Sequence, residues 1–348
     1  MKKRVRQTDV ARLAGVSPAT VSLVINNRSG GSVRISEETR QRVLDAVNQL
    51  SYVVDPAARS LAGGQNAILG VFTFESIFPL THRDFYYPFL VGIEEGAEDL
   101  GYDLLLFTSA GHQTGLRRIY RSGVNRLRMA DGAILLGNEG SKEELQQLVD
   151  EGYPFVFVGR REVARGDVAY AGADYTAATS SVVEAMMAIG HRSIAYLGAP
   201  VQTESLTDRR EGYRRALAGA GYGFDPGLLY LCTDDELQPP FLVDLQRKGV
   251  TAIVVETGTL APRFLHVCRE MGIQIPRDLS FAMLGDPTVD WDFEHDITMF
   301  RIPRREMGQE AIRLLAALLT DDYDGERQIM LPCEFVPGST LMPPRPVR

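Results

Sequence analysis

The chain has 348 residues, of which 45% are hydrophobic and 24% charged, and it carries a formal net charge of −8 at pH 7. This length favours two or three domains, and the composition is typical of a soluble globular protein. No apolar run is long enough to span a bilayer, and no apolar segment follows the basic start Met1–Arg4 as it would in a signal peptide. We therefore exclude secreted, membrane and fibrous proteins and expect a cytoplasmic protein with no membrane partner.

The residue types that carry catalysis or metal binding form no motif. Three cysteines lie far apart and fit neither a metal spacing nor a disulfide framework, so we expect free thiols. Five histidines show no metal-ligand spacing and no nucleophile partner. We therefore predict no metal, no cofactor and no catalytic site, and hence no enzyme. The residues concerned are Cys232, Cys268, Cys333, His82, His112, His191, His266 and His295.

Charge is distributed unevenly along the chain. Residues 1–64, the head, contain ten Lys/Arg and five Asp/Glu, a net of +5, which leaves −13 for the remaining residues, the body. A small basic head on a large acidic body predicts that the head binds a polyanion and the body does not. A solvated surface with a basic end would explain the charge equally well, so the residue pattern of the head has to decide between the two.

The head begins with two short helical patterns. The first helix starts near Thr8, buries an apolar stripe at i, i+3 and i+4, and stops at Gly15. Ser17 is a good N-cap and Pro18 is preset for a first helical position, so a second helix starts there. The predicted stripes are Val10, Leu13 and Ala14 in the first helix and Val21, Val24 and Ile25 in the second.

A third helix follows at Ser36, and two short helices on a third favour a helix-turn-helix unit. The second helix of such a unit lies in the DNA major groove. A generic small helical bundle remains the alternative. The side chains that the second helix would present away from its stripe are Pro18, Ala19, Thr20, Ser22 and Leu23.

Several stretches of the head resemble one known family closely. Asp9–Ser22, Asn26–Asn27 and Ser36–Arg40 are similar to the DNA-binding head of the LacI/GalR family of bacterial transcriptional regulators, and so is Leu50–Tyr52 running into Ala57–Leu61. The resemblance implies a helix-turn-helix DNA-binding domain over residues 1–54, a hinge helix and linker over 55–64, and a two-lobed effector-binding and dimerisation domain over 65–348.

The resemblance also implies roles for individual head residues. The helix from Ser17 is the expected recognition helix, and Leu61 is the expected wedge that enters a central base step from the minor groove. Ordinary packing is the alternative for Leu61. The DNA-binding residues expected in this way are Thr8, Ser17, Pro18, Ala19, Thr20, Ser22, Leu23, Asn26, Ala57, Ala58 and Leu61.

Two features of the head depart from the family. Leu23 stands where many members carry a polar or basic base-reading side chain, and it can touch a thymine methyl but cannot pair with guanine. The stretch Ser29–Arg34 is longer than the usual turn before the third helix. We therefore expect an operator half-site that differs from the usual one.

The body alternates apolar strand patterns with helix-sized segments, which predicts parallel sheets with right-handed crossovers. Its size fits two lobes with a ligand between them, the periplasmic-binding-protein-like α/β arrangement that the resemblance implies. We expect the chain to change lobe near Gly172, Arg301 and Pro332. The predicted strands are 68–74, 102–107, 132–136, 155–158, 193–197, 252–255 and 279–284, and the predicted helices are 89–100, 142–151, 177–190, 208–220 and 260–272.

Ligands of parallel sheets bind beyond the carboxyl ends of the strands, so the effector residues should follow strands. Phe85 and Tyr86 fall in an aromatic loop before a helix, where the family has effector contacts, although packing would also explain them. Arg209 precedes a Gly-aromatic pair, as in the family, and its guanidinium suits a carboxylate, a phosphate or paired hydroxyls. Arg160 and Asp174 each follow a strand, and helix capping is the alternative for Asp174.

The second half of the body departs from the family at its sugar-gripping positions. Thr257-Gly258 replaces an Asn-Asp pair, and Gly285 replaces the first acid of a Gly-aromatic-Asp-Asp motif, which leaves Asp286 as a substitute. Trp291 lies just beyond and could stack on a ligand. These losses argue against an ordinary neutral hexose, and Arg160 and Arg209 near the cleft would suit an acidic or phosphorylated sugar-like ligand. We therefore expect a sugar, sugar acid or sugar phosphate as effector.

These patterns predict a homodimeric, ligand-responsive repressor that binds operator DNA in a sequence-specific way. A solute-binding receptor of the same architecture would leave the head unexplained. An enzyme on a doubly wound fold would need catalytic residues that the sequence lacks.

Overall fold

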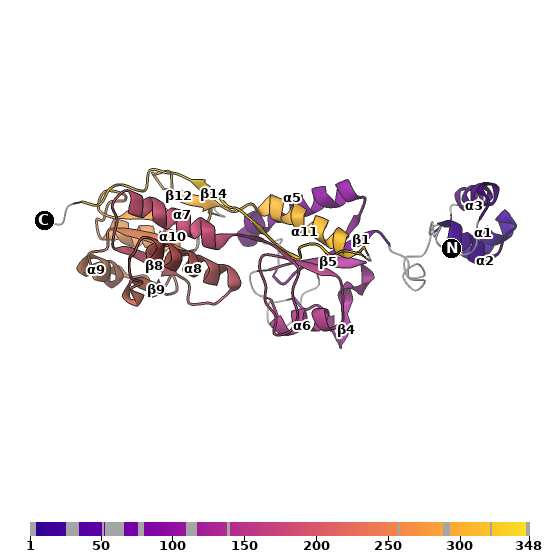
Figure 1. Ribbon diagram of the computed structural model, residues 1–348, viewed down its shortest axis with the longest axis horizontal. Coiled ribbons are helices and arrows are strands. Elements are labelled where there is room, and N and C mark those ends of the chain that lie inside the picture. Colours follow the sequence, from indigo (N-terminus) through magenta and orange to yellow (C-terminus); the bar gives the residue numbers. More distant parts are fainter. Residues whose placement is uncertain are drawn as a thin grey trace. The chain divides into compact units, whose positions relative to one another are not determined.

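The computed structural model describes residues 5–25, 35–50, 52, 66–75, 80–108, 117–137, 140–256, 258–287, 293–320 and 322–345, with side chains given from residue 85 onward in the helix that begins at 80. The chain divides into two compact units, Met1–Ile68 and Leu69–Arg348 (Figure 1). The predicted hinge residues 55–64 lie outside the described residues, so the domain boundary around them stays a prediction.

The first unit contains the three helices expected in the head: α1 (Gln7–Ala14), α2 (Pro18–Ile25) and α3 (Glu37–Gln49). One prediction about its core is wrong, because Leu13 is 46% exposed and Ala11, at 3%, occupies the core in its place. The small Ala side chain lets α1 approach the other two helices closely. The buried core consists of Val10, Ala11, Ala14, Val21, Val24, Val43 and Ala46.

Local chemistry fixes the two turns of this unit. Gly15 ends α1 with φ +67°, a left-handed conformation that glycine adopts without strain. The Gln7 side-chain amide donates to the Pro18 carbonyl at 3.0 Å and so ties the start of α1 to the start of α2. Ser36 caps α3 by accepting from the Thr39 amide at 3.3 Å.

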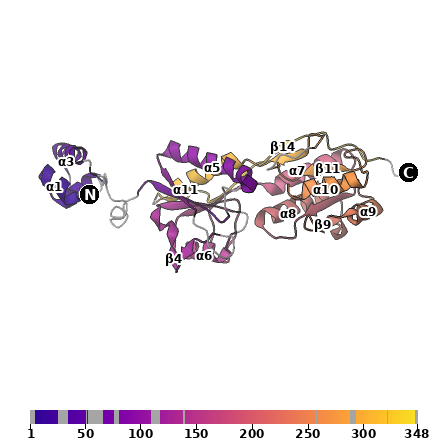
Figure 2. The ribbon, with the colours of Figure 1, turned by 180° about the vertical axis from the view of Figure 1, so that it is seen from behind.

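The second unit contains two six-stranded sheets, and the first, with its helices, is called the N-lobe here. Helices α5 (Leu80–Leu100) and α11 (Arg304–Leu318) pack together on one face of this sheet, and α6 (Lys142–Asp150) packs on the other (Figures 1 and 2). The sheet order is β13 (Gln328–Leu331), β7 (Tyr170–Ala173), β6 (Phe155–Val158), β5 (Gly132–Leu136), β1 (Ile68–Thr73) and β2 (Asp103–Phe107).

The N-lobe corrects one expectation about the effector aromatics. Phe85 and Tyr86 lie inside α5, which begins at Leu80 and continues through Pro88, rather than in a loop before a helix that starts at 89. Burial explains the earlier start, since Tyr86 and Phe89 are 2% and 5% exposed and pack into the lobe core. The described part of the β2–β5 connection is a hairpin, β3 (Tyr120–Arg121) and β4 (Val124–Asn125), followed by the short 3-10 helix η1 (Arg126–Met129).

The second sheet and its helices form the C-lobe. Helices α7 (Tyr175–Ala188) and α8 (Glu204–Gly219) cover one face, and α9 (Pro239–Arg247) and α10 (Leu260–Glu270) cover the other. A short 3-10 helix, η2 (Pro226–Leu228), leads into the edge strand β9. The sheet order is β14 (Glu334–Val336), β12 (Thr298–Arg301), β11 (Ser280–Met283), β10 (Ala252–Val255), β8 (Ile194–Gly198) and β9 (Leu229–Leu231), parallel except for the β12–β14 pair.

The chain crosses between the lobes three times, at the places that the sequence predicts. It leaves the N-lobe after Ala173, returns after Arg301 and leaves again after Leu331. Two of these crossings run side by side, because the Asp174 amide donates to the Leu331 carbonyl at 2.8 Å. The carboxyl ends of the parallel strands of both sheets therefore meet at the junction of the lobes. Within the described residues, no helix combines the length and the apolarity needed to cross a membrane.

His191 anchors the end of the chain to the C-lobe. Its side chain is fully buried, its Nε2 lies 2.9 Å from the Met342 carbonyl, and its Nδ1 lies 2.8 Å from the Thr251 hydroxyl. Burial lowers the pKa of His191 below its ordinary value of 6.5, because the apolar surroundings disfavour the charged ring. The neutral ring is therefore the form that the fold selects.

We expect this histidine to make the body less stable in acid. With the folded pKa lowered, its stabilisation is fully present above the ordinary pKa of 6.5 and is lost as the pH falls from there through the lower pKa of the folded state. The melting temperature of the wild type should therefore fall more steeply between about pH 7 and pH 5 than that of His191→Gln. His266→Gln is the control, because His266 is half exposed and pairs with Glu270 one turn away on the same helix. Equal slopes for wild type and His191→Gln would contradict the assignment.

Candidate nucleic-acid interface and effector cleft

The outward face of α2 is uncharged. Pro18 and Ala19 are exposed, whereas Thr20, Ser22 and Leu23 are half-buried beside the core valines of the same helix. A face of this kind reads bases through hydroxyl groups and apolar contacts, and it leaves phosphate neutralisation to charges elsewhere in the head. Thr8 on α1 is also exposed.

Ser17 has a structural task within the head. Its hydroxyl oxygen accepts from the Thr20 amide at 3.1 Å and lies 2.9 Å from the Thr20 hydroxyl, which makes it the N-terminal cap of α2. Ser17 thus fixes where the helix begins. The remaining expected DNA contacts, Asn26, Ala57, Ala58 and Leu61, lie outside the described residues and stay predictions.

A small cavity lies at the junction of the two lobes and is lined by both. Phe85 and Tyr86 contribute the aromatic side from α5, Arg161 follows β6, and Tyr175 and Ser205 come from the C-lobe helices α7 and α8. The Tyr86 hydroxyl donates to a Glu75 carboxylate oxygen. The cavity encloses about 50 Å³, far below the roughly 300–1,000 Å³ of ordinary ligand pockets. A sugar-sized ligand therefore needs the lobes to move apart.

Arg160 does not line this cavity, although Arg161 does. Arg160 grips Asp208 of α8 with two hydrogen bonds, from Nε at 3.0 Å and from Nη2 at 2.7 Å, and it also pairs with Glu162. Arg161 is 8% exposed, donates to the Gly137 carbonyl at 2.5 Å, and stacks 4.3 Å from the Phe157 ring centre. Its burial lowers the pKa of its guanidinium. The two neighbouring arginines thus perform different tasks.

Arg209 is a buried bridge within the C-lobe. At 7% exposure, its Nε donates to the Leu284 carbonyl at 2.8 Å and its Nη1 donates to the Ser205 carbonyl at 3.0 Å. Its guanidinium lies 3.8 Å from the ring centre of Tyr175. Among the described residues, no hydrogen bond reaches its Nη2, and a Cβ on Gly285 would lie 3.6 Å from that atom. Arg209 itself is not among the residues that line the small cavity.

The two acidic candidates have protein partners. Asp174 caps α7 by accepting from the Ala177 amide at 2.9 Å, which is the alternative role that the sequence offered. Asp286 accepts from the Ile302 amide at 2.9 Å and pairs with Arg304, whose guanidinium also lies 5.4 Å from the Phe85 ring centre. Thr257 and Trp291 lie outside the described residues.

The two departures from the sugar-gripping pattern have structural counterparts. Gly285 has φ +144°, a conformation that favours glycine, so the backbone here disfavours a carboxylate side chain. Glu256, which directly precedes Thr257, is 2% exposed and pairs with Arg210 at 3.1 Å. Its second oxygen accepts from the Ala199 amide at 2.8 Å. The Glu256 carboxylate at the end of β10 is thus held by partners inside the C-lobe.

The structure adds residues that the sequence analysis missed. Arg161, Tyr175 and Ser205 line the cavity, and Glu204 lies beside them on α8. Arg161 directly follows the candidate Arg160, and Tyr175 directly follows the candidate Asp174. The sequence therefore indicated the right strand ends but not the right side chains. Which of two adjacent side chains faces the cleft depends on the local backbone, which the sequence pattern did not resolve.

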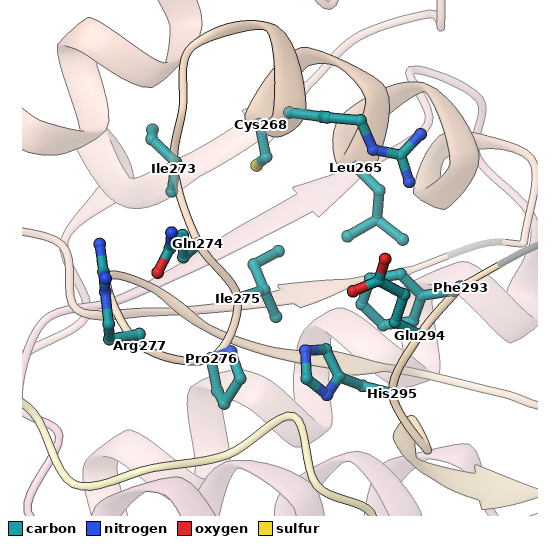
Figure 3. Close-up of a pocket in the computed structure, with 11 residues that line it drawn as sticks. Leu265, Cys268, Ile273, Gln274, Ile275, Pro276, Arg277, Phe293, Glu294 and His295 are labelled. Carbon is teal, nitrogen blue, oxygen red and sulfur yellow. The ribbon is translucent and has the colours of Figure 1, made fainter.

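A larger cavity, of about 420 Å³, lies in the C-lobe (Figure 3). Leu265 and Cys268 project into it from α10, with Pro276 and His295 on the opposite side. It adjoins the turn that leads into β11, at the amino ends of the parallel strands. Because ligands of parallel sheets bind at the carboxyl ends, size alone does not make this cavity the effector site.

Comparison with known protein families agrees with the division into head and body. Residues 8–55 match the bacterial regulatory proteins of the lacI family, and residues 183–341 match a periplasmic binding protein-like domain. The HTH-type transcriptional regulator CelR of Thermobifida fusca is 30% identical over 329 residues, covering 92% of this chain and 94% of that protein.

Two solved structures share the architecture. The CelR–cellobiose complex superimposes with a TM-score of 0.63 at 25% identity, covering 97% of this chain and 100% of that one. The lac repressor dimer bound to operator and the anti-inducer ONPF gives a TM-score of 0.65 at 22% identity, with coverage of 98% and 100%. The second likeness shows the fold alone.

We expect Arg209→Ala to destabilise the body. The change removes the Arg209 side-chain donor from the buried Leu284 carbonyl, and an unsatisfied buried acceptor costs about 1–3 kcal/mol. It also removes the hydrogen bond to the Ser205 carbonyl and the stacking on Tyr175. The midpoint of guanidinium-induced unfolding should fall, and Arg209→Lys should recover part of the loss because one ammonium reaches one carbonyl. Unchanged unfolding of Arg209→Ala would show that the guanidinium is not needed by the fold.

Proposed function

We propose that this chain, which belongs to the LacI family of bacterial regulatory proteins, is a repressor whose binding to operator DNA is controlled by a small sugar-like effector. Members of this family are DNA-binding transcriptional regulators and not enzymes. The observation that carries the proposal is the joining of a helix-turn-helix unit to a two-lobed body whose aromatic and arginine residues converge where the strands end. It would act in the cytoplasm, where its operator lies.

The head supports the DNA-binding half of the proposal. The exposed, uncharged face of α2 suits base edges, and the net charge of +5 over residues 1–64 suits the phosphate backbone. The hinge residues, with Ala57, Ala58 and Leu61, would add the minor-groove contacts that the family resemblance implies.

The cleft supports a ligand of low charge. Three arginines of the lobe junction already have carboxylate partners, Arg160 with Asp208, Arg161 with Glu204, and Arg304 with Asp286. Among the described arginines of the junction, Arg209 bonds carbonyl groups instead of a carboxylate, and Phe85 and Tyr86 bring aromatic rings to the wall of the cavity. A neutral sugar therefore fits better than a sugar acid or sugar phosphate, and the CelR–cellobiose complex makes cellobiose the first compound to test.

The body also supports homodimer formation. Strand β2 is an edge of the N-lobe sheet, and Leu104 and Leu106 on it are 37% and 39% exposed. Because side chains alternate along a strand, both lie on the face opposite Phe107, which packs with the core on the α6 side. An apolar edge strand is a ready template for pairing and needs a cover. A second copy of the chain would provide it and would bring two heads to a two-fold operator.

The function is tested by two direct measurements. A gel shift on the DNA upstream of the chain's own gene should show specific binding that weakens with salt, since phosphate contacts release counterions. A thermal-shift panel of cellobiose, other sugars, sugar acids and sugar phosphates should raise the melting temperature for the effector class alone. Binding to no DNA fragment, or equal binding to all, would contradict the proposal.

We expect Leu61→Ala to weaken specific DNA binding far more than nonspecific binding. The side chain is uncharged, so it should contribute to base-step wedging and nothing to counterion release. Competition titrations with operator and random DNA at one salt concentration measure the ratio. An unchanged specificity ratio would assign Leu61 to packing.

We expect the double variant Leu104→Lys/Leu106→Lys to be a monomer. Two ammonium groups on each copy would meet like charges across the proposed interface. Sedimentation at micromolar concentration should show a dimer for the wild type and half that mass for the variant. Val124→Lys, at a position 64% exposed on the β4 hairpin, is the control and should stay dimeric. A monomeric wild type, with and without DNA, would refute the dimer.

A further inference from the structure

A set of ion pairs joins the two lobes beside the cleft. Asp208 of α8, in the C-lobe, holds Arg160 of the N-lobe through both Nε and Nη2, at 3.0 Å and 2.7 Å. This is a bidentate arrangement, the geometry in which an arginine–carboxylate pair is strongest. The two side chains are only 21% and 14% exposed, so water screens them weakly.

A second carboxylate, that of Glu204, lies one turn earlier on the same helix and faces two N-lobe cations. Glu204 is 3.5 Å from the Lys142 ammonium and 3.7 Å from the Arg161 guanidinium, both in the N-lobe. It also accepts from the Glu162 amide at 3.4 Å. Because residues four apart share one face of a helix, Glu204 and Asp208 present two carboxylates together to three N-lobe cations. That charge pattern is complementary across the lobe boundary, and Arg160 also pairs with Glu162 of its own lobe.

We propose that Glu204 and Asp208 are positioning residues for the effector response: with Lys142, Arg160 and Arg161 they form a latch that holds the lobes closed over the cleft. The inference rests on the proposed function for its biological meaning, since it concerns how the same cleft opens. That these ion pairs hold the lobes closed does not depend on which ligand binds.

The position of the latch explains why it controls access. Ser205, next to Glu204, and Arg161 both line the 50 Å³ cavity, so the ion pairs lie at its wall. Admitting a sugar requires the lobes to separate there, and separation breaks every one of these pairs. The fraction of molecules with an open cleft scales the apparent affinity of any ligand that needs it. The latch therefore sets ligand affinity by setting the fraction of molecules whose cleft is open.

The latch is tested on the full chain, with no ligand, by measuring the distance between the lobes. Spin labels on Cys substituted for Gln147 of α6 and Ala218 of α8, both exposed, report the separation by pulsed electron resonance. Cys232→Ser and Cys333→Ala remove the two partly exposed native thiols. We expect Glu204→Gln/Asp208→Asn to lengthen the distance by more than about 2 Å, the scale of lobe and domain rearrangements. Circular dichroism checks that the variant is folded.

Arg160→Gln tests the same contact from the other lobe. It should shift the distance in the same direction, and combining it with Asp208→Asn should add little beyond the single changes, because both remove one interaction. Glu211→Gln is the matched control, since Glu211 on the same helix pairs with Arg215 within that helix and should shift nothing.

Three outcomes would overturn the latch: an unchanged distance in the folded double variant, an equal shift in Glu211→Gln, or additive effects of Arg160→Gln and Asp208→Asn. None of these bears on DNA binding, which the gel shift measures separately. Failure of the gel shift with a lengthened distance would instead reject the proposed function and leave the latch standing.

Discussion

The triple passage of the chain between the lobes is the constraint on which the body depends. The crossings after Ala173 and Leu331 are hydrogen-bonded to each other through the Asp174 amide, and Arg301 and Glu334, an ion pair, flank the return. Segments tied in this way allow the lobes to rotate about the junction but not to slide or separate freely. Motion in the cleft is thereby reduced to opening and closing, which is a change that ion pairs at one edge can control.

Several buried or half-buried arginines of the body are paired with a carboxylate. The net charge of −13 outside the head coexists with buried guanidinium groups, and a buried charge is tolerated only when it is paired. Arg210 has Glu256, Arg304 has Asp286, and Arg160 has Asp208. Arg209 differs from these three, since its described hydrogen bonds go to carbonyl groups and its guanidinium lies against Tyr175. An aromatic face takes the place of a carboxylate there.

Sequence reasoning and structure diverge at particular residues, for physical reasons. Apolar spacing placed Leu13 in the head core, but spacing does not tell which of two neighbouring apolar positions meets the next helix, and the smaller Ala11 does. The predicted helix began at residue 89, but α5 begins at Leu80, and the burial of Tyr86 and Phe89 accompanies the earlier start. Arg160 fitted the pattern of a ligand contact, yet the acid that it grips lies 48 residues away in the other lobe.

The sequence by itself determined the helix-turn-helix head, the alternation of strands and helices in the body, and the three places where the chain changes lobe. The head and the alternation follow from local propensity, capping and periodicity, which act over a few residues, whereas the lobe changes follow from the resemblance to a two-lobed family. Only the tertiary structure decided that Arg161 rather than Arg160 lines the cavity, that Arg209 supports the fold, and that Glu204 and Asp208 face N-lobe cations. These depend on contacts between segments distant in the chain, where the pairing of charges is settled by which side chains the folded lobes bring within a few ångströms.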